Sequence, residues 1–454
     1  MLDIIVLAAG RGTRMKSDLP KVLHPIAGRP MLVHVLDALE PFRDRAIHLV
    51  VGHGSELLKK TLGDDPPINF IEQQQQLGTG HAVQQVISAL ETAETVLILY
   101  GDVPLIQTHT LEQLVQKVNK SALSLLTVTL DNPNGYGRII RDSKGSVKAI
   151  AEQKDASDEQ RKIREVNTGI MAVNGRQLKR WLPQLNNNNA QGEYYLTDII
   201  ALAVAEGVHI ECSQPLYEWE VLGVNNRSQQ AQLERIYQLQ LADQLMSDGV
   251  TLMDPQRFDC RGQLSCGSDT YIDVNCVFEG NNYLGNQVII GPNCLLKNAR
   301  IGDNTTIAAN SIIEGTDIGR DCHIGPFARL RPGTQLADRA RVGNFVETKK
   351  AIIGADSKIN HLSYVGDAVL GKGVNIGAGT ITCNYDGANK HQTTIGDDVF
   401  IGSNTALVAP VAVKNSATIG AGSTITNDVE SDQLSLTRAP QKTFSGWKRP
   451  QQKK

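Results

Sequence analysis

The sequence predicts two domains of different class, an α/β domain with a mostly parallel sheet and, after it, an all-β parallel helix built from six-residue repeats. Over the first 225 or so residues, apolar runs alternate with amphipathic stretches, which is the pattern of buried strands joined by helices. From about residue 262 onward an apolar residue recurs at every sixth position. That period fits neither an α-helix nor a single strand, but it fits a β-helix.

Four apolar runs in the first part are expected to be strands of the sheet, over residues 4–8, 47–51, 96–100 and 123–128. Residues 227–248 contain no Gly or Pro and place Leu233, Tyr237, Leu241 and Leu245 four residues apart. This spacing predicts one amphipathic helix, ended by Gly249, that forms a stiff connector. The expected domains are therefore 1–226, the connecting helix 227–248, and 249–454 with a basic C-terminal tail.

The six-residue period shifts by one residue twice and then continues almost to the end. Three hexads are expected to close one coil, and stacked coils then bury a continuous apolar column. The inward positions are Ile272, Phe278, Leu284, Ile290, Leu296, Ile301, Ile307, Ile313, Ile318, Ile324, Leu330, Leu336, Val342, Ile395, Ile401, Leu407, Val413, Ile419 and Ile425. Between Ile376 and Ile395 the period breaks, which indicates either a loop on the binding face or a neutral insertion.

Composition excludes several function classes. The net charge is −3 and no basic stripe is present, so nucleic-acid binding is not expected. Seven cysteines without a CxxC pair indicate reduced thiols and no zinc site. The N-terminal apolar run is too short for a membrane span and follows no basic stretch. We expect a cytoplasmic protein without a membrane partner.

Two features of the first domain indicate phosphate and metal chemistry. The segment LAAGRGTRM has Gly10 and Gly12 in a turn after the first strand, with Arg11, Arg14 and Lys21 as nearby cations. Such a turn can present backbone N–H groups to a phosphate, although it can also be a plain strand–helix turn. Asp102 follows the apolar strand 96–100, at the sheet edge where α/β proteins bind ligands. It is a candidate Mg²⁺ ligand, or alternatively a helix N-cap.

The longer string LAAGxGTRMxSxxPKxL, from Leu7 to Leu23, resembles the signature of sugar-1-phosphate nucleotidylyltransferases. The resemblance is closest to the N-acetylglucosamine-1-phosphate uridylyltransferase half of a bacterial bifunctional enzyme family, and it implies a Rossmann-like domain. It assigns Asp102 and Asn225 to Mg²⁺, and Arg14 and Lys21 to catalysis. It places UTP and the sugar nucleotide on Leu7, Ala8, Ala9, Gly10, Lys21, Gln73, Gly78, Thr79, Tyr100, Gly101, Asp102, Gly137, Glu152, Asn167 and Asn225.

Four motifs of the second domain resemble the glucosamine-1-phosphate acetyltransferase half of the same family: RLRPG at 329–333, NFVETKKA at 344–351, NHLSYVGDA at 360–368 and NIGAGTITCNYDG at 375–387. The resemblance implies a left-handed β-helix. Acetylating an amine needs a base, and a histidine is suited to that task near neutral pH. His361 is the candidate, although a lone histidine in a repeat can also be a corner residue.

The same resemblance assigns the remaining residues of the second site. Glucosamine-1-phosphate is expected on Arg331, Lys349, Tyr364, Asn375 and, as a residue that orients His361 or the amine, Glu347. Acetyl-CoA is expected on Asn384, Tyr385 and the loop that continues to Lys390, with Ala378, Ser403, Ala421 and Arg438 along its pantetheine and nucleotide.

The implied function is a bifunctional transferase. It acetylates glucosamine-1-phosphate with acetyl-CoA and then, with Mg²⁺, transfers a uridylyl group from UTP to N-acetylglucosamine-1-phosphate, which releases pyrophosphate. The family also implies a homotrimer formed through the β-helix and a product used for peptidoglycan and lipopolysaccharide. Two alternatives are a β-helix that serves only as a structural or regulatory module, and a non-catalytic scaffold. The joint presence of both sets of site residues argues against them.

Overall fold

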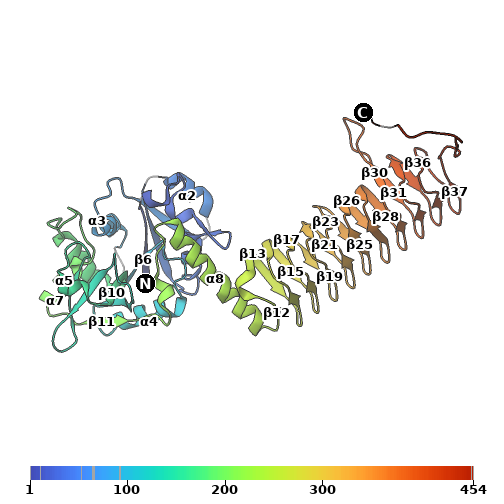
Figure 1. The fold of residues 1–454 in the computed structure, drawn as a ribbon. Coiled ribbons are helices and arrows are strands. Elements are labelled where there is room, and N and C mark those ends of the chain that lie inside the picture. The colour runs from blue at the N-terminus through green and yellow to red at the C-terminus, as the bar shows by residue number, and fades with distance from the viewer. Residues whose placement is uncertain are drawn as a thin grey trace. The chain divides into compact units, whose positions relative to one another are not determined.

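The computed structural model describes residues 2–10, 12–52, 54–63, 67–90, 94–450 and 452. The chain forms two compact units, Met1–Tyr237 and Gln238–Lys454, and each is treated by itself. The division falls within the helix α8, Arg227–Ser247 (Figure 1). A helix is therefore present where the sequence predicts one, while the domain boundaries at 226 and 249 stay predictions. Among the described residues, no helix is both long and apolar enough to cross a bilayer.

The first unit is a doubly wound α/β domain, as the sequence predicts. Its main sheet has the order β11-β7-β10-β6-β1-β4-β5, parallel except for β10, which runs antiparallel to β6 and β7. The short antiparallel pair of β2 and β3 lies apart from it. The strands are β1 Leu2–Ala8, β2 Pro25–Ile26, β3 Arg29–Pro30, β4 Arg45–Val51, β5 Ile68–Glu72, β6 Thr95–Tyr100, β7 Leu123–Thr129, β8 Gly137–Arg141, β9 Val147–Ala151, β10 Glu165–Asn174 and β11 Ile210–Ser213.

Two apolar cores cover the two faces of this sheet. Leu32 of α1 and Leu114 of α4 belong to one core, and Val83 of α3 and Trp181 of α6 belong to the other. Strands buried on both faces must be apolar throughout, which explains why their sequences read as unbroken runs. The helices are α1 Met31–Asp37, α2 Ser55–Leu62, α3 Thr79–Gln84, α4 Thr108–Val118, α5 Asp158–Arg161, α6 Gly175–Trp181, α7 Asp198–Ala205 and α8.

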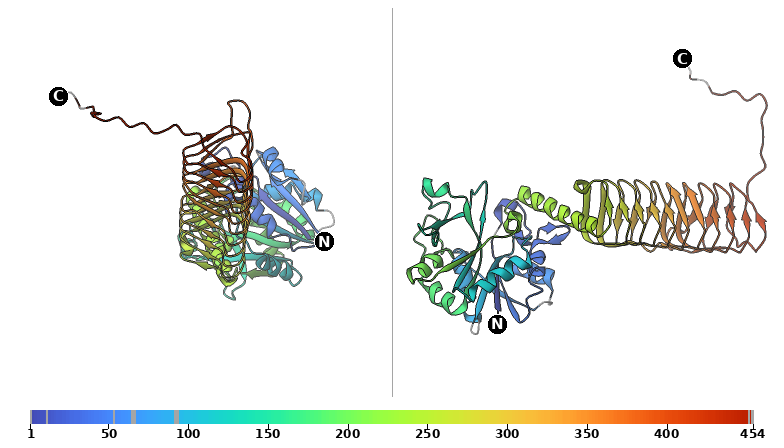
Figure 2. Two further views of the ribbon diagram at one scale, coloured as in Figure 1. Left: turned by 90° about the vertical axis from the view of Figure 1, so that its right-hand side faces the viewer. Right: turned by 90° about the horizontal axis from the view of Figure 1, so that it is seen from below.

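The second unit is a parallel β-helix with flat faces (Figure 2). Its strands are β12 Thr251–Leu252, β13 Phe258–Cys266, β14 Tyr271–Ile272, β15 Cys276–Leu284, β16 Ile289–Ile290, β17 Leu295–Lys297, β18 Arg300–Ile301, β19 Thr306–Ile307, β20 Ile312–Glu314, β21 Asp317–Ile318, β22 His323–Ile324, β23 Arg329–Leu330, β24 Gln335–Leu336, β25 Arg341–Asn344, β26 Glu347–Ile353, β27 Lys358–His361, β28 Tyr364–Leu370, β29 Asn375–Ile376, β30 Ile381–Cys383, β31 Thr393–Ile395, β32 Phe400–Ile401, β33 Ala406–Val408, β34 Val411–Val413, β35 Thr418–Ile419, β36 Thr424–Ile425 and β37 Leu434–Ser435.

The predicted inward residues are all buried and form one continuous core. Their one-residue shifts have a simple cause, because coils differ in length. Phe278 pairs with Leu296 eighteen positions later, whereas Leu296 pairs with Ile313 after seventeen. A shorter face removes one residue from the coil and leaves the stacking intact.

The interruption predicted after Ile376 begins later than expected. Thr382 takes the next inward position, where its hydroxyl bonds the backbone N–H and C=O of Gly366 at 2.8 and 2.9 Å. A polar residue at this position hides the repeat from a search for apolar residues. The inserted loop itself covers residues 384–392, between β30 and β31.

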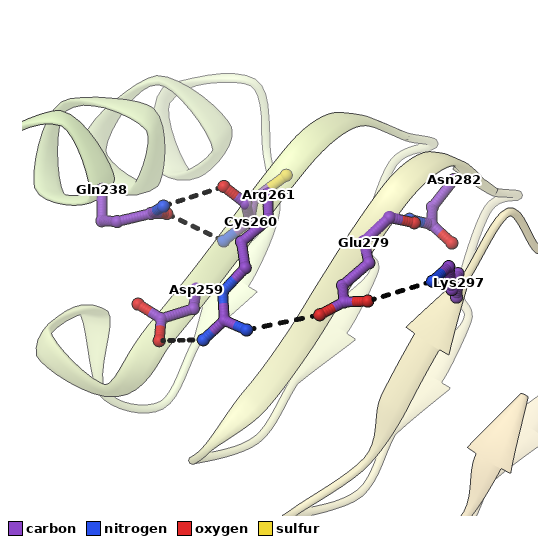
Figure 3. A network of polar contacts seen from close by, with 7 residues as sticks. All are labelled: Gln238, Asp259, Cys260, Arg261, Glu279, Asn282 and Lys297. Carbon is purple, nitrogen blue, oxygen red and sulfur yellow. Dashed lines mark hydrogen bonds and ion pairs between the residues drawn. The ribbon is translucent and has the colours of Figure 1, made fainter. Parts of the chain in front are cut away.

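Helix α8 contains one fully buried polar residue that the helical pattern did not predict. Gln238 donates from Nε2 to the carbonyl of Cys260 and accepts on Oε1 from the Cys260 N–H, both at 2.8 Å (Figure 3). Cys260 lies on β13, the outermost strand of its face. The side-chain amide therefore replaces a neighbouring peptide group and satisfies an edge that would otherwise be open.

We expect Gln238→Leu to lower the free energy of unfolding of the second unit by roughly 2–4 kcal/mol, because two buried backbone groups lose their partners. The measurement is calorimetric unfolding of the full chain. Gln244→Ala is the matched control, since Gln244 lies on the exposed side of the same helix and bonds only Asp248. If the two variants unfold at the same temperature, the proposed role of Gln238 is wrong.

Candidate active sites

A cleft of about 370 Å³ lies at the carboxyl edge of the parallel sheet in the first unit, where β1 and β6 end. β1 and β6 are paired in parallel, so their carboxyl ends lie at the same edge of the sheet. Most residues that the sequence assigned to nucleotide binding line the cleft. They are Leu7, Ala8, Ala9, Gly10, Lys21, Gln73, Gly78, Thr79, Tyr100, Asp102 and Asn225. Arg11 lies outside the described residues.

Two oxygen ligands converge on a positive charge in this cleft. Lys21 Nζ donates to the Asp102 carboxylate and also lies 3.3 Å from Asn225 Oδ1. Arg14 donates to the same Asn225 oxygen at 3.0 Å. Lys21 and Asp102 are about 14% and 15% exposed, so the charge pair is partly shielded from water. The Lys21 ammonium thus marks a point where a cation is held by a carboxylate and an amide oxygen.

The far end of the cleft carries a rigid amide. Gln73 is buried, and its Nε2 lies 3.2 Å from the carbonyl of Gly78 and 3.0 Å from Nδ1 of His81. With both N–H groups engaged, the orientation of the amide is fixed and Oε1 is left as an acceptor. Gln76, which the sequence reasoning missed, lines the same cleft and donates to the carbonyl of Ala9. Its place in the run QQQQ gave no signal that separates it from its neighbours.

Tyr100 connects the cleft to the predicted sugar-binding residues. Burial, followed by the charges of Glu152 and Asp102, raises the pKa of Tyr100 far above its ordinary value, so the phenol keeps its proton. Gly169 has φ +83°, and a Cβ there would lie 2.5 Å from the Tyr100 ring. Asn167 accepts from the Gly169 N–H at 3.1 Å, within an irregularity of strand β10 where its register with β7 shifts.

Glu152 lies beside Gly137, where an added Cβ would come within 3.3 Å of its Oε1. Thr197 donates to the same oxygen at 2.9 Å. Burial raises the pKa of Glu152 above its usual value. A second cavity of about 260 Å³ shares Tyr100, Asp102 and Asn225 with the first. It adds Tyr136 and Thr168, which the sequence reasoning did not single out.

The second unit stacks five predicted or adjacent site residues in one column. The strand register places Asn344 beside His361 and, two residues after each inward isoleucine, Ala378, Ser403 and Ala421 in line with them. Backbone bonds of the next residues follow the same column, from Asn404 to Ala378 and from Gly422 to Ser403 at 2.7 and 2.8 Å. Successive coils are about 4.8 Å apart, so His361 heads a row of small side chains. Arg438 donates to the carbonyl of Ala421 at 3.1 Å.

A cluster of cations lies on a neighbouring face. Along this face the charges alternate from coil to coil: Arg261 pairs with Glu279, Glu279 with Lys297, and Lys297 with Glu314. The alternation ends at Arg331 and Lys349, which are both positive and occupy adjacent coils. A break in a regular charge pattern indicates a site for an anion.

The local contacts pair one of these cations with a carboxylate and bring a third cation close to the other. Arg331 donates to Glu347 at 2.8 Å, and this bond raises the pKa of the guanidinium. The pKa of Lys349 is lowered, and the proximity of Lys390 is the largest cause. Lys390, which the sequence reasoning placed only at the end of the acetyl-CoA loop, therefore belongs with Arg331 and Lys349. Only the fold brings these three side chains together.

The inserted loop is braced by its own hydrogen bonds. Asp386 accepts from the N–H groups of Ala388 and Asn389 and from His391, and these bonds hold the pKa of that carboxyl well below its usual range. Tyr385 donates to the carbonyl of Gly387. These hydrogen bonds give the inserted loop a defined conformation.

Asn384 ties the start of this loop to the preceding coil. It donates to Asp367 at 2.5 Å and lies 3.5 Å from the Tyr364 hydroxyl. Asp367 was not among the predicted residues. Asn375 begins β29, and Ala378 lies two residues after the end of that strand.

Comparison with known proteins gives matches over both units. The MobA-like NTP transferase domain family matches residues 4–168, the GMPPB C-terminal domain 260–346, and the bacterial transferase hexapeptide (six repeats) 392–427. Three curated relatives carry the name Bifunctional protein GlmU. They come from Marinobacter nauticus (59% identical, 99% of each chain covered), Cellvibrio japonicus (60%, 100% of each) and Saccharophagus degradans (60%, 100% of each).

Among solved structures, HddC from Yersinia pseudotuberculosis complexed with GMP-PN aligns with 17% identity and a TM-score of 0.39. The alignment covers 52% of this chain and 100% of that one.

We expect Lys390→Met to raise the pKa of Lys349, because it removes the positive charge that most disfavours protonation there. Lysines dimethylated with a ¹³C label can be followed by NMR as the pH rises, and the Lys349 signal should titrate at higher pH in the variant. Lys414→Met is the control, since Lys414 pairs with Glu430 elsewhere on the solenoid. An unchanged Lys349 titration in Lys390→Met would contradict the cluster.

Proposed function

The chain belongs to the family of bifunctional GlmU proteins, and we propose that its two sites carry out successive steps in the synthesis of UDP-N-acetylglucosamine. The family pairs a uridylyltransferase with an acetyltransferase, and the matches to each type of domain fall in separate units. The observation that carries the proposal is that each unit gathers a complete and chemically different set of side chains.

In the first unit the proposed reaction is an in-line displacement. A phosphate oxygen of N-acetylglucosamine-1-phosphate attacks the α-phosphorus of UTP, the α–β bridging P–O bond breaks, and pyrophosphate leaves. Both reactants are anions, so catalysis consists of positioning and charge neutralisation. Lys21 and Arg14 supply fixed positive charge, and the backbone around Ala9 and Gly10 lines the same cleft.

The chemistry of the donors fits Mg²⁺. Asp102 and Asn225 offer a carboxylate and an amide oxygen around one point, which the Lys21 ammonium marks. Mg²⁺ in nucleotide-dependent enzymes takes one or two such protein oxygens and completes its shell with water and substrate phosphates. When bound, the ion would neutralise charge on the phosphates. Among the described residues, no group of three or more His, Cys, Asp or Glu side chains is arranged so that it could hold a metal ion.

The fixed amide of Gln73 accounts for base selection in this proposal. Its free Oε1 can accept the N3–H of uracil, which cytosine lacks. A site built to accept that proton leaves a buried acceptor unpaired when the wrong base enters, which costs binding energy. Glu152, Asn167 and Gly137, gathered near Tyr100, are proposed to hold the sugar.

In the second unit the proposed reaction is acetyl transfer. The amine nitrogen of glucosamine-1-phosphate attacks the thioester carbonyl of acetyl-CoA, the C–N bond forms, the C–S bond breaks, and His361 removes the proton from nitrogen. The thiol of coenzyme A is the leaving group. Arg331, Lys349 and Lys390 are proposed to bind the sugar phosphate, because they form the cationic cluster on the neighbouring face.

The column above His361 suits an extended acyl carrier. Ala378, Ser403 and Ala421 have small side chains, so they leave room along the coils, and Arg438 lies at the far end with a charge for a phosphate. Asn384 and Tyr385, at the start of the inserted loop, are proposed to contact the acyl carrier as well. Tyr364 and Asn375 would contact the sugar. A homotrimer is also part of the proposal, since His361 is exposed and a second subunit would cover it. A cytoplasmic location is proposed as well.

The two activities should be separable. We expect Asp102→Asn to reduce uridylyl transfer by about 10²–10³-fold, because a charge needed at the reacting phosphates is lost. Acetyl transfer by the same protein should stay at the wild-type rate. Pyrophosphate release and free-thiol formation measure the two reactions independently. Asp158→Asn, at an exposed carboxylate of the same unit, is the control, and loss of both activities in folded Asp102→Asn protein would refute two independent sites.

His361→Ala should lower acetyl transfer by about 10²–10⁴-fold, the usual contribution of a positioned base. Wild-type acetyl transfer should fall on acidification, because a protonated imidazole cannot accept the proton of the amine, and the variant should lack that dependence. Uridylyl transfer should not change. His323→Ala removes another exposed histidine from the same face of the solenoid and should behave like wild type; equal rates in both variants would mean that His361 is only a corner residue.

A further inference from the structure

His361 has a hydrogen-bond partner that neither the sequence motifs nor the proposed roles account for. Its Nδ1 lies 2.9 Å from Oδ1 of Asn344. The two residues occupy the same position on successive coils, because β25 and β27 are paired in parallel with Asn344 opposite His361. Asn344 begins the motif NFVETKKA, but its role could not be read from the sequence.

We propose that Asn344 is a positioning residue that holds the neutral His361 ring in the tautomer with its proton on Nδ1, an inference that rests on the proposed role of His361 as base. The Asn344 oxygen accepts from Nδ1–H, so the lone pair is on Nε2. Nε2 is then the atom that takes the proton from the substrate amine as the C–N bond forms. A ring in the other tautomer would present N–H to the amine and could not act as its base.

The choice of an amide over a carboxylate has a chemical consequence. A carboxylate at position 344 would stabilise the protonated ring and so retain the proton that a base must exchange. The neutral amide orients the ring without adding that charge. Glu347, which the sequence offered as the orienting residue, is engaged by Arg331 at 2.8 Å. The charged side chains nearest in the register are Arg341 and Lys358, three residues away along β25 and β27.

The backbone around this pair is fixed in both coils. The Leu362 N–H donates to the Asn344 carbonyl at 3.1 Å, and the Ser363 hydroxyl donates to the His361 carbonyl at 2.8 Å. The residues that follow the pair, Phe345 and Leu362, have φ of 56° and 48°, which bulky side chains rarely adopt. The same left-handed corner recurs on the preceding coils at Asn310 and Phe327, so it belongs to the solenoid as a whole. The corners that follow Asn344 and His361 therefore have similar backbone conformations.

The first test uses Asn344→Ala and Asn344→Asp in the full chain. Asn344→Ala should lower kcat for acetyl transfer by about 10–100-fold, as is usual when the orienting partner of a functional histidine is lost, with KM for glucosamine-1-phosphate within about threefold of wild type. Asn344→Asp should retain more activity at high pH but lose it at a higher pH than wild type on acidification. Uridylyl transfer should be unchanged in both, which verifies folding of the other unit.

Asn286→Ala is the matched control, because Asn286 also makes a coil-to-coil contact, with Asp303 at 3.2 Å, far from His361 along the solenoid. It should keep the wild-type kcat and pH profile. An Asn344→Ala enzyme with those same properties overturns the inference, as does an Asn344→Asp enzyme whose acidic limb does not move.

The decisive test is a double-mutant cycle. A residue that acts only through His361 should have no effect once His361 is gone, so His361→Ala/Asn344→Ala should equal His361→Ala. Additive losses would mean that Asn344 is merely structural, and they overturn the inference. If His361→Ala itself retains full acetyl transfer, the proposed base is wrong; if it collapses while Asn344→Ala does not, only the positioning role fails.

Discussion

Parallel strand pairing is the constraint on which both sites depend. In the first unit, β1 and β6 run side by side in the same direction, so Ala8, Tyr100 and the following Asp102 meet at one edge. In the second unit, every coil lies on the one before it in parallel register, so residues 17 or 18 positions apart become neighbours in most coils, and residues 25 apart do so across the inserted loop. Parallel pairing therefore brings together residues that are distant in the sequence. In the first unit they line a cleft, and in the second they form columns along the coils.

The second consequence of this pairing is electrostatic. A solenoid repeats each surface position every coil, so like charges at one position would repel along its length. Alternation from Arg261 to Glu314 avoids that repulsion. The alternation ends where Arg331, Lys349 and Lys390 lie close together, and Lys390 is the largest cause of the lowered pKa of Lys349. An anionic substrate would relieve this repulsion, which is a physical reason for such a cluster to bind a phosphate.

Periodic features could be predicted from the sequence, and unique contacts could not. Four strands of the α/β unit, β1, β4, β6 and β7, and the inward residues of the β-helix followed from apolar spacing alone, and the resemblance to a family supplied the candidate residues. The inward position of Thr382 was not predicted, because its polar side chain interrupts the apolar pattern. Its hydroxyl is nevertheless hydrogen-bonded inside the core. Gln238 escaped because helical periodicity does not show which polar residue meets an exposed strand edge.

The roles of Lys390 and Asn344 could not be predicted for a different reason. Each acquires a role only from a neighbour on another coil or loop, and that neighbour is defined by the exact number of residues in each coil. A seventeen-residue coil and an eighteen-residue coil give different partners for the same motif. Side-chain pairing between coils therefore has to be observed in the structure.

The central claim is that one chain joins both reactions at separate sites, and it can be tested with a ¹³C-labelled acetyl group. Glucosamine-1-phosphate, labelled acetyl-CoA, UTP and Mg²⁺ are mixed with protein, and the products are identified by mass spectrometry. Asp102→Asn alone should accumulate labelled N-acetylglucosamine-1-phosphate, His361→Ala alone should form neither product, and the two variants together should restore labelled UDP-N-acetylglucosamine. Failure of the mixture to form that product, although each variant keeps its other activity, would contradict the claim.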